Sequence, residues 1–251
     1  MQDSVRSVDR ALQVLELLAG GPMRLSDLAR QAGLPVSTTH RLLVTMEQRG
    51  FVQAEPDSAM WAVGRQAFAV GAAFSSRHSF LAPAILSLRR LRDATRETAN
   101  LGTILSGEVS IVAQAESREI TRAIAAPGAR TPVVLSAMGK AIIATWPEEA
   151  VDALVERHGF RAMTARSIRD IDSLKAELAI VRQRGFAVDD EEFVSGIRCV
   201  AAVVRDPTGE PNCAISVSGQ AARLPEAKLP QVAAQVMEHA ADLSRRLQLL
   251  A

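Results

Sequence analysis

The sequence predicts an α+β protein of two domains, in which a small helical module with a β-hairpin precedes a larger domain with a largely antiparallel sheet. A chain of 251 residues is long for one compact domain and comfortable for two. Hydrophobic residues make up 48% of the chain and charged residues 23%, which is the balance of a globular protein. Strand patterns occur in pairs joined by short turns, with helical patterns around them. These observations exclude a disordered or fibrous chain.

The first 64 residues carry the pattern of three helices followed by a hairpin. The expected helices span residues 8–19, 25–32 and 37–49, and the expected strands span residues 51–54 and 60–63. Glycine ends each helix, at Gly20, Gly33 and Gly50, and Ser26 is the expected N-cap of the second helix. This order predicts a winged helix-turn-helix domain.

The rest of the chain carries the pattern of a linker helix and an α+β domain. A connecting helix is expected over residues 65–80, where alanine and serine dominate, and the larger domain is expected over residues 81–251. The domain's expected strands span residues 98–105, 109–114, 197–205 and 213–218, and its expected helices span residues 83–96, 136–145, 148–158, 171–184 and 229–250. Short turns join the strands of each pair, so the sheet should be largely antiparallel.

Charge and cysteine content limit the partners and the compartment. The formal net charge is +1, and residues 1–65 hold seven arginines and seven acidic residues, so DNA binding would depend on individually placed side chains and on dimerisation. Two cysteines, Cys199 and Cys213, suit a reducing compartment. The N-terminus lacks a signal-peptide pattern, and the longest apolar stretch, residues 67–74, is too short to cross a bilayer. We therefore expect a cytoplasmic protein.

The third helix of the first domain has the pattern of a DNA-reading helix. At 100° per residue, Leu42, Leu43 and Met46 fall on one side with Thr39, which leaves the other side free for a DNA groove. The candidate DNA contacts lie at the N-terminal end of the helix: Ser37, Thr38, His40 and Arg41. Arg41 could bond a guanine or a phosphate. The alternative is an ordinary helical hairpin in which Ser37 caps the helix and Arg41 is solvated.

Three segments of the first domain resemble the signature segments of the IclR family of transcriptional regulators. They are SVDRAL at residues 7–12, LPVSTTHRLL at residues 34–43 and GFV at residues 50–52. Val36 departs from the family pattern, in which a basic residue is frequent. The resemblance implies that a winged helix-turn-helix binds double-stranded operator DNA as a homodimer or as a dimer of dimers. It also implies that a larger domain binds a small-molecule effector.

The resemblance continues through the second domain. The matching segments are LSAMGKA at residues 135–141, GFAVDDEE at residues 185–192, GIRCVAA at residues 196–202 and AISVSG at residues 214–219. They resemble the GAF-like effector-binding domain of the family. By that resemblance the effector pocket, which suits a small carboxylate, is lined by Ala137, Met138, Asp189, Ile197, Cys199, Ser216 and Ser218. Ser216 and Ser218 are two apart on an expected strand, so their hydroxyls should share one face.

The same residues have simpler interpretations. Alternating serines usually face solvent, a cysteine such as Cys199 is by default a small buried hydrophobe, and residues 189–192 have the composition of a hydrated loop. A hydrolase activity in the second domain is the alternative function. Against it, the four histidines are scattered and none of the common catalytic motifs occurs. We therefore expect no enzyme, no metal and no cofactor, but a ligand-responsive one-component regulator, a repressor, that senses a small organic acid.

Overall fold

The computed structural model describes residues 5–56, 58–77, 81–117, 127–206 and 208–249. The chain divides into two compact units, residues 1–78 and residues 79–251. Each unit has its own hydrophobic core. No helix of the described residues is both long enough and apolar enough to cross a membrane.

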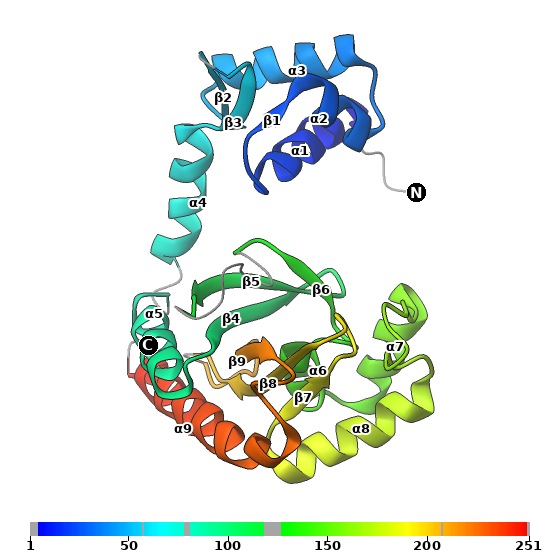
Figure 1. Cartoon of the computed structure of the whole chain (residues 1–251), viewed down its shortest axis with the longest axis vertical. Coiled ribbons are helices and arrows are strands. Elements are labelled where there is room, and N and C mark those ends of the chain that lie inside the picture. The colour runs from blue at the N-terminus through cyan, green and yellow to red at the C-terminus, as the bar shows by residue number, and fades with distance from the viewer. Residues whose placement is uncertain (1–4, 57, 78–80, 118–126, 207, 250–251) are drawn as a thin grey trace. The chain divides into compact units, whose positions relative to one another are not determined.

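The first unit contains three helices and a small sheet (Figure 1). Its elements are α1 (Arg6–Leu18), β1 (Met23–Arg24), α2 (Leu25–Ala32), α3 (Val36–Gln48), β2 (Val52–Glu55), β3 (Met60–Val63) and α4 (Arg65–Arg77). The sheet has the antiparallel order β1-β3-β2. Apolar residues from α1, α2, α3 and the sheet form one core, with Val14, Leu28 and Leu43 completely buried. The helices and the hairpin therefore form the winged helix-turn-helix that the sequence predicts.

Two details of this unit differ from expectation. The N-cap of α2 is Arg24 and no side chain caps the helix, so the assignment of Ser26 as N-cap was wrong. The chain enters α2 directly from β1, which pairs Met23 with Trp61 and was not expected from the sequence. Gly33 does end α2 in the left-handed conformation, with φ 64°, a region that glycine enters without steric cost.

Helix α4 follows β3 directly and covers most of the expected connecting helix. Residues 78–80, the end of that expected helix, lie outside the described residues. Phe68 and Val70 on α4 are 79% and 53% exposed within the chain.

The second unit is a six-stranded antiparallel sheet with helices on both faces (Figure 1). The strands follow the order β6-β5-β4-β9-β8-β7, so the two expected strand pairs meet along β4 and β9. The strands are β4 (Thr98–Leu105), β5 (Glu108–Ala115), β6 (Arg130–Pro132), β7 (Ala187–Asp190), β8 (Ile197–Val204) and β9 (Cys213–Gln220). The helices are α5 (Leu81–Thr95), α6 (Ala137–Ile143), α7 (Glu148–His158), α8 (Ile171–Arg184), the 3-10 turn η1 (Glu226–Lys228) and α9 (Leu229–Gln248). The short edge strands β6 and β7 were not expected.

Strand alternation divides the second unit into two cores. On β9, Cys213, Ile215 and Val217 pack under α5 and α9, whereas Ala214 lies in the other core with α6 and α8. Because successive side chains of a strand point to opposite faces, Ser216 and Ser218 lie on the face of Ala214. The face that carries α6 therefore combines apolar packing with a polar region near the middle of the sheet.

Candidate functional site

Helix α3 presents the four candidate DNA contacts at its N-terminal end. Ser37, His40 and Arg41 are exposed and Thr38 is half-buried. The opposite side of the helix is fixed in the core, where Thr39 and Leu43 are completely buried. The Thr39 hydroxyl donates to the Pro35 carbonyl at 3.2 Å, so this buried polar group is paired. Pro35 is the N-cap, and the helix begins at Val36 with no side-chain cap, so Ser37 does not cap α3.

The seven candidate effector residues line one cavity of about 50 Å³ in the second unit. Ala137 and Met138 come from α6, Asp189 from β7, Ile197 and Cys199 from β8, and Ser216 and Ser218 from β9. The structure thus gathers residues that lie up to 81 positions apart in the sequence (218 − 137). The simple interpretation of the two serines as solvent-facing is wrong, because Ser216 is 1% and Ser218 is 8% exposed.

Eight further residues line the cavity and were missed at the level of sequence. They are Thr98, Asn100, Ile111, Gln114, Thr131, Ser136, Phe193 and Val194. Thr98 and Asn100 carry the same signal as the two serines, since they are polar residues two apart on a strand. Gln114 reaches this face because of a β-bulge. The pairing of β4 with β5 shifts between Leu101 and Gly102, which restarts the alternation in β5.

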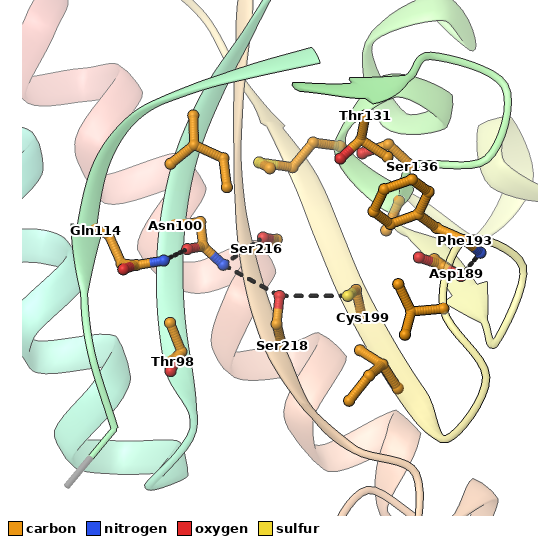
Figure 2. A pocket seen from close by; sticks show the side chains of 15 residues that line it. Thr98, Asn100, Gln114, Thr131, Ser136, Asp189, Phe193, Cys199, Ser216 and Ser218 are labelled. Carbon is orange, nitrogen blue, oxygen red and sulfur yellow. Dashed lines mark hydrogen bonds between the residues drawn. The ribbon is translucent and has the colours of Figure 1, made fainter. Parts of the chain in front are cut away.

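A chain of side-chain hydrogen bonds crosses the floor of the cavity (Figure 2). Gln114 Nε2 donates to Asn100 Oδ1 at 2.7 Å, and Asn100 Nδ2 donates to Ser218 Oγ at 3.1 Å and to Ser216 Oγ at 3.4 Å. The Cys199 thiol donates to Ser218 Oγ at 3.2 Å. The four neighbouring strands β5, β4, β9 and β8 therefore share one polar network, and its hydroxyl, amide and thiol groups face the cavity.

Asp189 is the acidic group of the cavity and is only 4% exposed. Its Oδ1 accepts hydrogen bonds from the backbone N–H of Glu192 at 2.8 Å and of Phe193 at 3.3 Å, which holds the turn after β7. Burial, assisted by the nearby negative charge of Glu192, raises the pKa of Asp189 to about 7, although these N–H groups and the charge of Lys140 act in the opposite direction. The interpretation of residues 189–192 as a hydrated loop was therefore wrong for Asp189.

A buried lysine lies next to this turn. The Lys140 ammonium group on α6 is completely buried and pairs with the Glu192 carboxylate, and Glu177 of α8 lies 3.6 Å from the same nitrogen. Burial raises the pKa of Glu192, whereas the charge of Lys140 opposes that shift. This pair fixes the turn after β7 against α6, so it positions two walls of the cavity relative to each other.

The thiol in the cavity is not set up as a nucleophile. Burial raises the pKa of the Cys199 thiol well above its usual range, so at neutral pH the group is a neutral hydrogen-bond donor rather than a thiolate nucleophile. The described lining residues include no histidine that could act as its base. Among the residues that the structure describes, no group of three or more His, Cys, Asp or Glu side chains could hold a metal ion.

Comparison with known proteins identifies the family. Residues 7–56 match the IclR helix-turn-helix domain, and residues 73–245 match the C-terminal domain of the bacterial transcriptional regulator IclR. The chain is 38% identical over 244 residues to the transcriptional repressor IclR of Escherichia coli, and the match covers 96% of this chain and 89% of that protein. The chain belongs to the IclR family of transcriptional regulators.

Other IclR-family proteins show the same likeness. The acetate operon repressor of Salmonella typhimurium is also 38% identical over 244 residues, with 96% of this chain and 89% of that protein covered. The crystal structure of a transcriptional regulator from Rhodococcus sp. RHA1 matches with a TM-score of 0.81 at 28% identity, covering 99% of this chain and 100% of that one. The chain is thus a DNA-binding transcriptional regulator of the IclR family, and the alternative of a hydrolase is not favoured.

Proposed function

We propose that Ser37, Thr38, His40 and Arg41 contact operator DNA and that the cavity of the second unit binds a small carboxylate effector. In this proposal residues 1–64 read DNA, residues 65–80 connect the domains, and residues 81–251 sense the effector. The observation that carries the proposal is the convergence of seven residues from four elements on one cavity with hydroxyl, amide and thiol donors.

The size and lining of the cavity favour a small acid. A water-sized group needs roughly 10–15 Å³, so about 50 Å³ accommodates roughly three to five such groups. Acids of about two or three carbon atoms come closest to that room. Ser216 and Ser218 offer hydroxyl donors to a carboxylate, while Ile197 and Met138 supply apolar walls that limit its size.

We also propose that the regulator acts as a homodimer or as a pair of dimers. The first domain is nearly neutral, so bulk charge supplies little affinity for DNA. In a dimer, two recognition helices on half-sites one DNA turn apart would make the same contacts twice and so supply the affinity for DNA. An effector that prefers one arrangement of the two heads then changes operator affinity by the same factor by which DNA changes effector affinity.

Substitution of Arg41 tests the DNA-reading helix. Arg41→Ala in the full chain should weaken binding to the chain's own promoter fragment roughly 5- to 150-fold, because a base contact from arginine is worth about 1–3 kcal/mol. Arg49→Ala is the matched control, since Arg49 is an exposed arginine at the C-terminal end of the same helix. Equal affinities of the wild type and Arg41→Ala at physiological salt would remove this role of Arg41.

Substitution of the two serines tests the sensing cavity. The double variant Ser216→Ala, Ser218→Ala should lose the effect of small acids on promoter binding while free-protein binding to DNA stays unchanged. Ser110→Ala is the control, because Ser110 lies on β5 of the same sheet and outside the lining of the cavity. A double variant that responds to acids like the wild type would refute the proposed effector site.

A further inference from the structure

The described lining of the cavity holds one acidic side chain and no basic one. Asp189 is that acid, and none of the other 14 lining residues is a lysine, an arginine or a histidine. An ionised effector in this cavity would therefore lie beside an ionised aspartate with no lining cation between them. Two negative charges within one small buried cavity, that of the effector and that of Asp189, repel each other strongly.

We propose that the effector enters this cavity together with one proton taken from the solvent, and that Asp189 carries this proton in the complex. This inference rests on the proposal that the effector is a carboxylate. The bound acid then faces a neutral carboxyl group that can donate a hydrogen bond to it. Such a bond between a carboxylic acid and a carboxylate is charge-assisted and short.

The charges around Asp189 do not supply a free cation. Lys140 on α6 is already shared between Glu192 and Glu177, and Arg184 on α8 donates to Glu177 at 2.9 Å. When every group of this cluster is ionised, three carboxylates face two cations, which leaves one negative charge before any effector binds. An anionic effector would raise the excess negative charge to two, and one proton bound by Asp189 would return it to one.

The other groups near β7 do not change this balance at the cavity. Asp190, the next residue of the strand, pairs with Arg166 and with Arg198 of β8, so those two arginines are engaged with another carboxylate. Cys199 faces Asp189 across the β7–β8 pair and is a neutral thiol at physiological pH, because burial raises its pKa. Asp189 is therefore the group that must accept the proton.

The geometry of Asp189 already suits the protonated form. Oδ1 accepts both backbone N–H groups of the turn, which leaves Oδ2 as the oxygen that carries the proton. The pKa of about 7 means that the free protein holds this proton about half of the time at neutral pH. Uptake is therefore fractional near pH 7 and approaches one proton well above it.

Calorimetry of the full chain with acetate, propionate and lactate tests the proposal, and the tightest binder of the three is carried forward. At each pH, titrations in two buffers that hold that pH and differ in ionisation enthalpy, such as phosphate and Tris at pH 8, give the number of protons taken up. We expect about one proton at pH 8 and close to none at pH 5.5. The dissociation constant should not change with pH in the acid range and should rise about tenfold per pH unit above pH 7, because Asp189 is then ionised in the free protein. The carboxyl group of each probe stays ionised over this range, so it adds no pH dependence of its own.

Two comparisons assign the proton to Asp189. Asp189→Asn keeps an Oδ1 acceptor for the turn and should bind the acid with no proton uptake at pH 8 and with a flat pH dependence. Asp190→Asn, on the other side of the same strand, should behave like the wild type. The amide of the selected acid, which carries no charge, should bind the wild type without proton uptake.

The outcomes distinguish a failure of this inference from a failure of the proposed carboxylate sensing. Saturable binding of an acid by the wild type at pH 8 without proton uptake overturns the inference and leaves carboxylate sensing intact. Uptake that persists in Asp189→Asn assigns the proton to another group and also overturns it. If none of the three acids binds at millimolar concentration, carboxylate sensing is refuted, and this inference falls with it.

Discussion

Gly139→Ala should both destabilise the second domain and weaken the proposed effector binding. A Cβ at Gly139 would lie 2.1 Å from the Val133 carbonyl oxygen and 2.8 Å from its carbonyl carbon, so α6 could not keep its place against the backbone of Val133. Overpacking of this kind costs about 1–3 kcal/mol. A backbone obstacle puts the cost at the upper end, and the higher helix propensity of alanine returns at most about 1 kcal/mol. The net expectation is a loss of about 2 kcal/mol.

Thermal unfolding of the full chain measures this effect. For a domain of this size, 2 kcal/mol lowers the Tm by roughly 4–8 °C. Effector binding should fall with it, because Ala137 and Met138 move with α6. Gly71→Ala is the matched control, since Gly71 is an exposed glycine within α4 whose added Cβ meets nothing within 4 Å. If Gly139→Ala melts like the wild type and binds acids normally, the close approach of α6 to Val133 is not needed.

Two further predictions concern the buried charges. Lys140→Met should lower the free energy of unfolding by about 3–5 kcal/mol, because it leaves the Glu192 carboxylate buried and unpaired, and adding Glu192→Gln should restore part of the loss in urea denaturation. For Asp189, the folded pKa of about 7 exceeds the ordinary 3.8, so the folded state binds the extra proton between these values. Stability should therefore fall as pH rises from about 4 to about 7, by a few kcal/mol at most, and Asp189→Asn should flatten that fall.

Periodicity was sufficient to predict the first domain and the central strands of the second. The stripe of α1, the glycine after α2 and the hairpin are local signals, and the structure places helices and strands within a few residues of the predicted bounds. The common face of Ser216 and Ser218 also follows from a local rule, the alternation of a strand. The gathering of seven residues from four segments was not a local inference, because it rested on the family resemblance.

The parts that the sequence could not predict depend on contacts between distant segments. Strands β6 and β7 are short edge strands, stabilised by their pairing with β5 and β8 rather than by a long apolar pattern of their own. Gln114 faces the cavity only because a bulge shifts the register of β5. Asp189 lies in an acidic segment that is typical of a solvated loop, yet the turn after β7 folds over it and buries it. Lys140 compensates the charge of the nearby Glu192. None of these features has a signal within one segment.

The hydrogen bonds on the floor of the cavity set a condition that any effector has to meet. Ser218 Oγ accepts hydrogen bonds from Asn100 and Cys199, so its own O–H is the group that it can donate to a ligand oxygen. One of these bonds is donated by the Cys199 thiol, a weak donor. The other comes from the Asn100 amide, which also donates a longer bond of 3.4 Å to Ser216 Oγ. Bonds from hydroxyl and amide groups to a carboxylate are charge-assisted and roughly twice as strong as neutral ones. An acid therefore gains more from the Ser218 O–H than an uncharged ligand of the same shape, and we expect the cavity to prefer the acid for this reason once Asp189 is protonated.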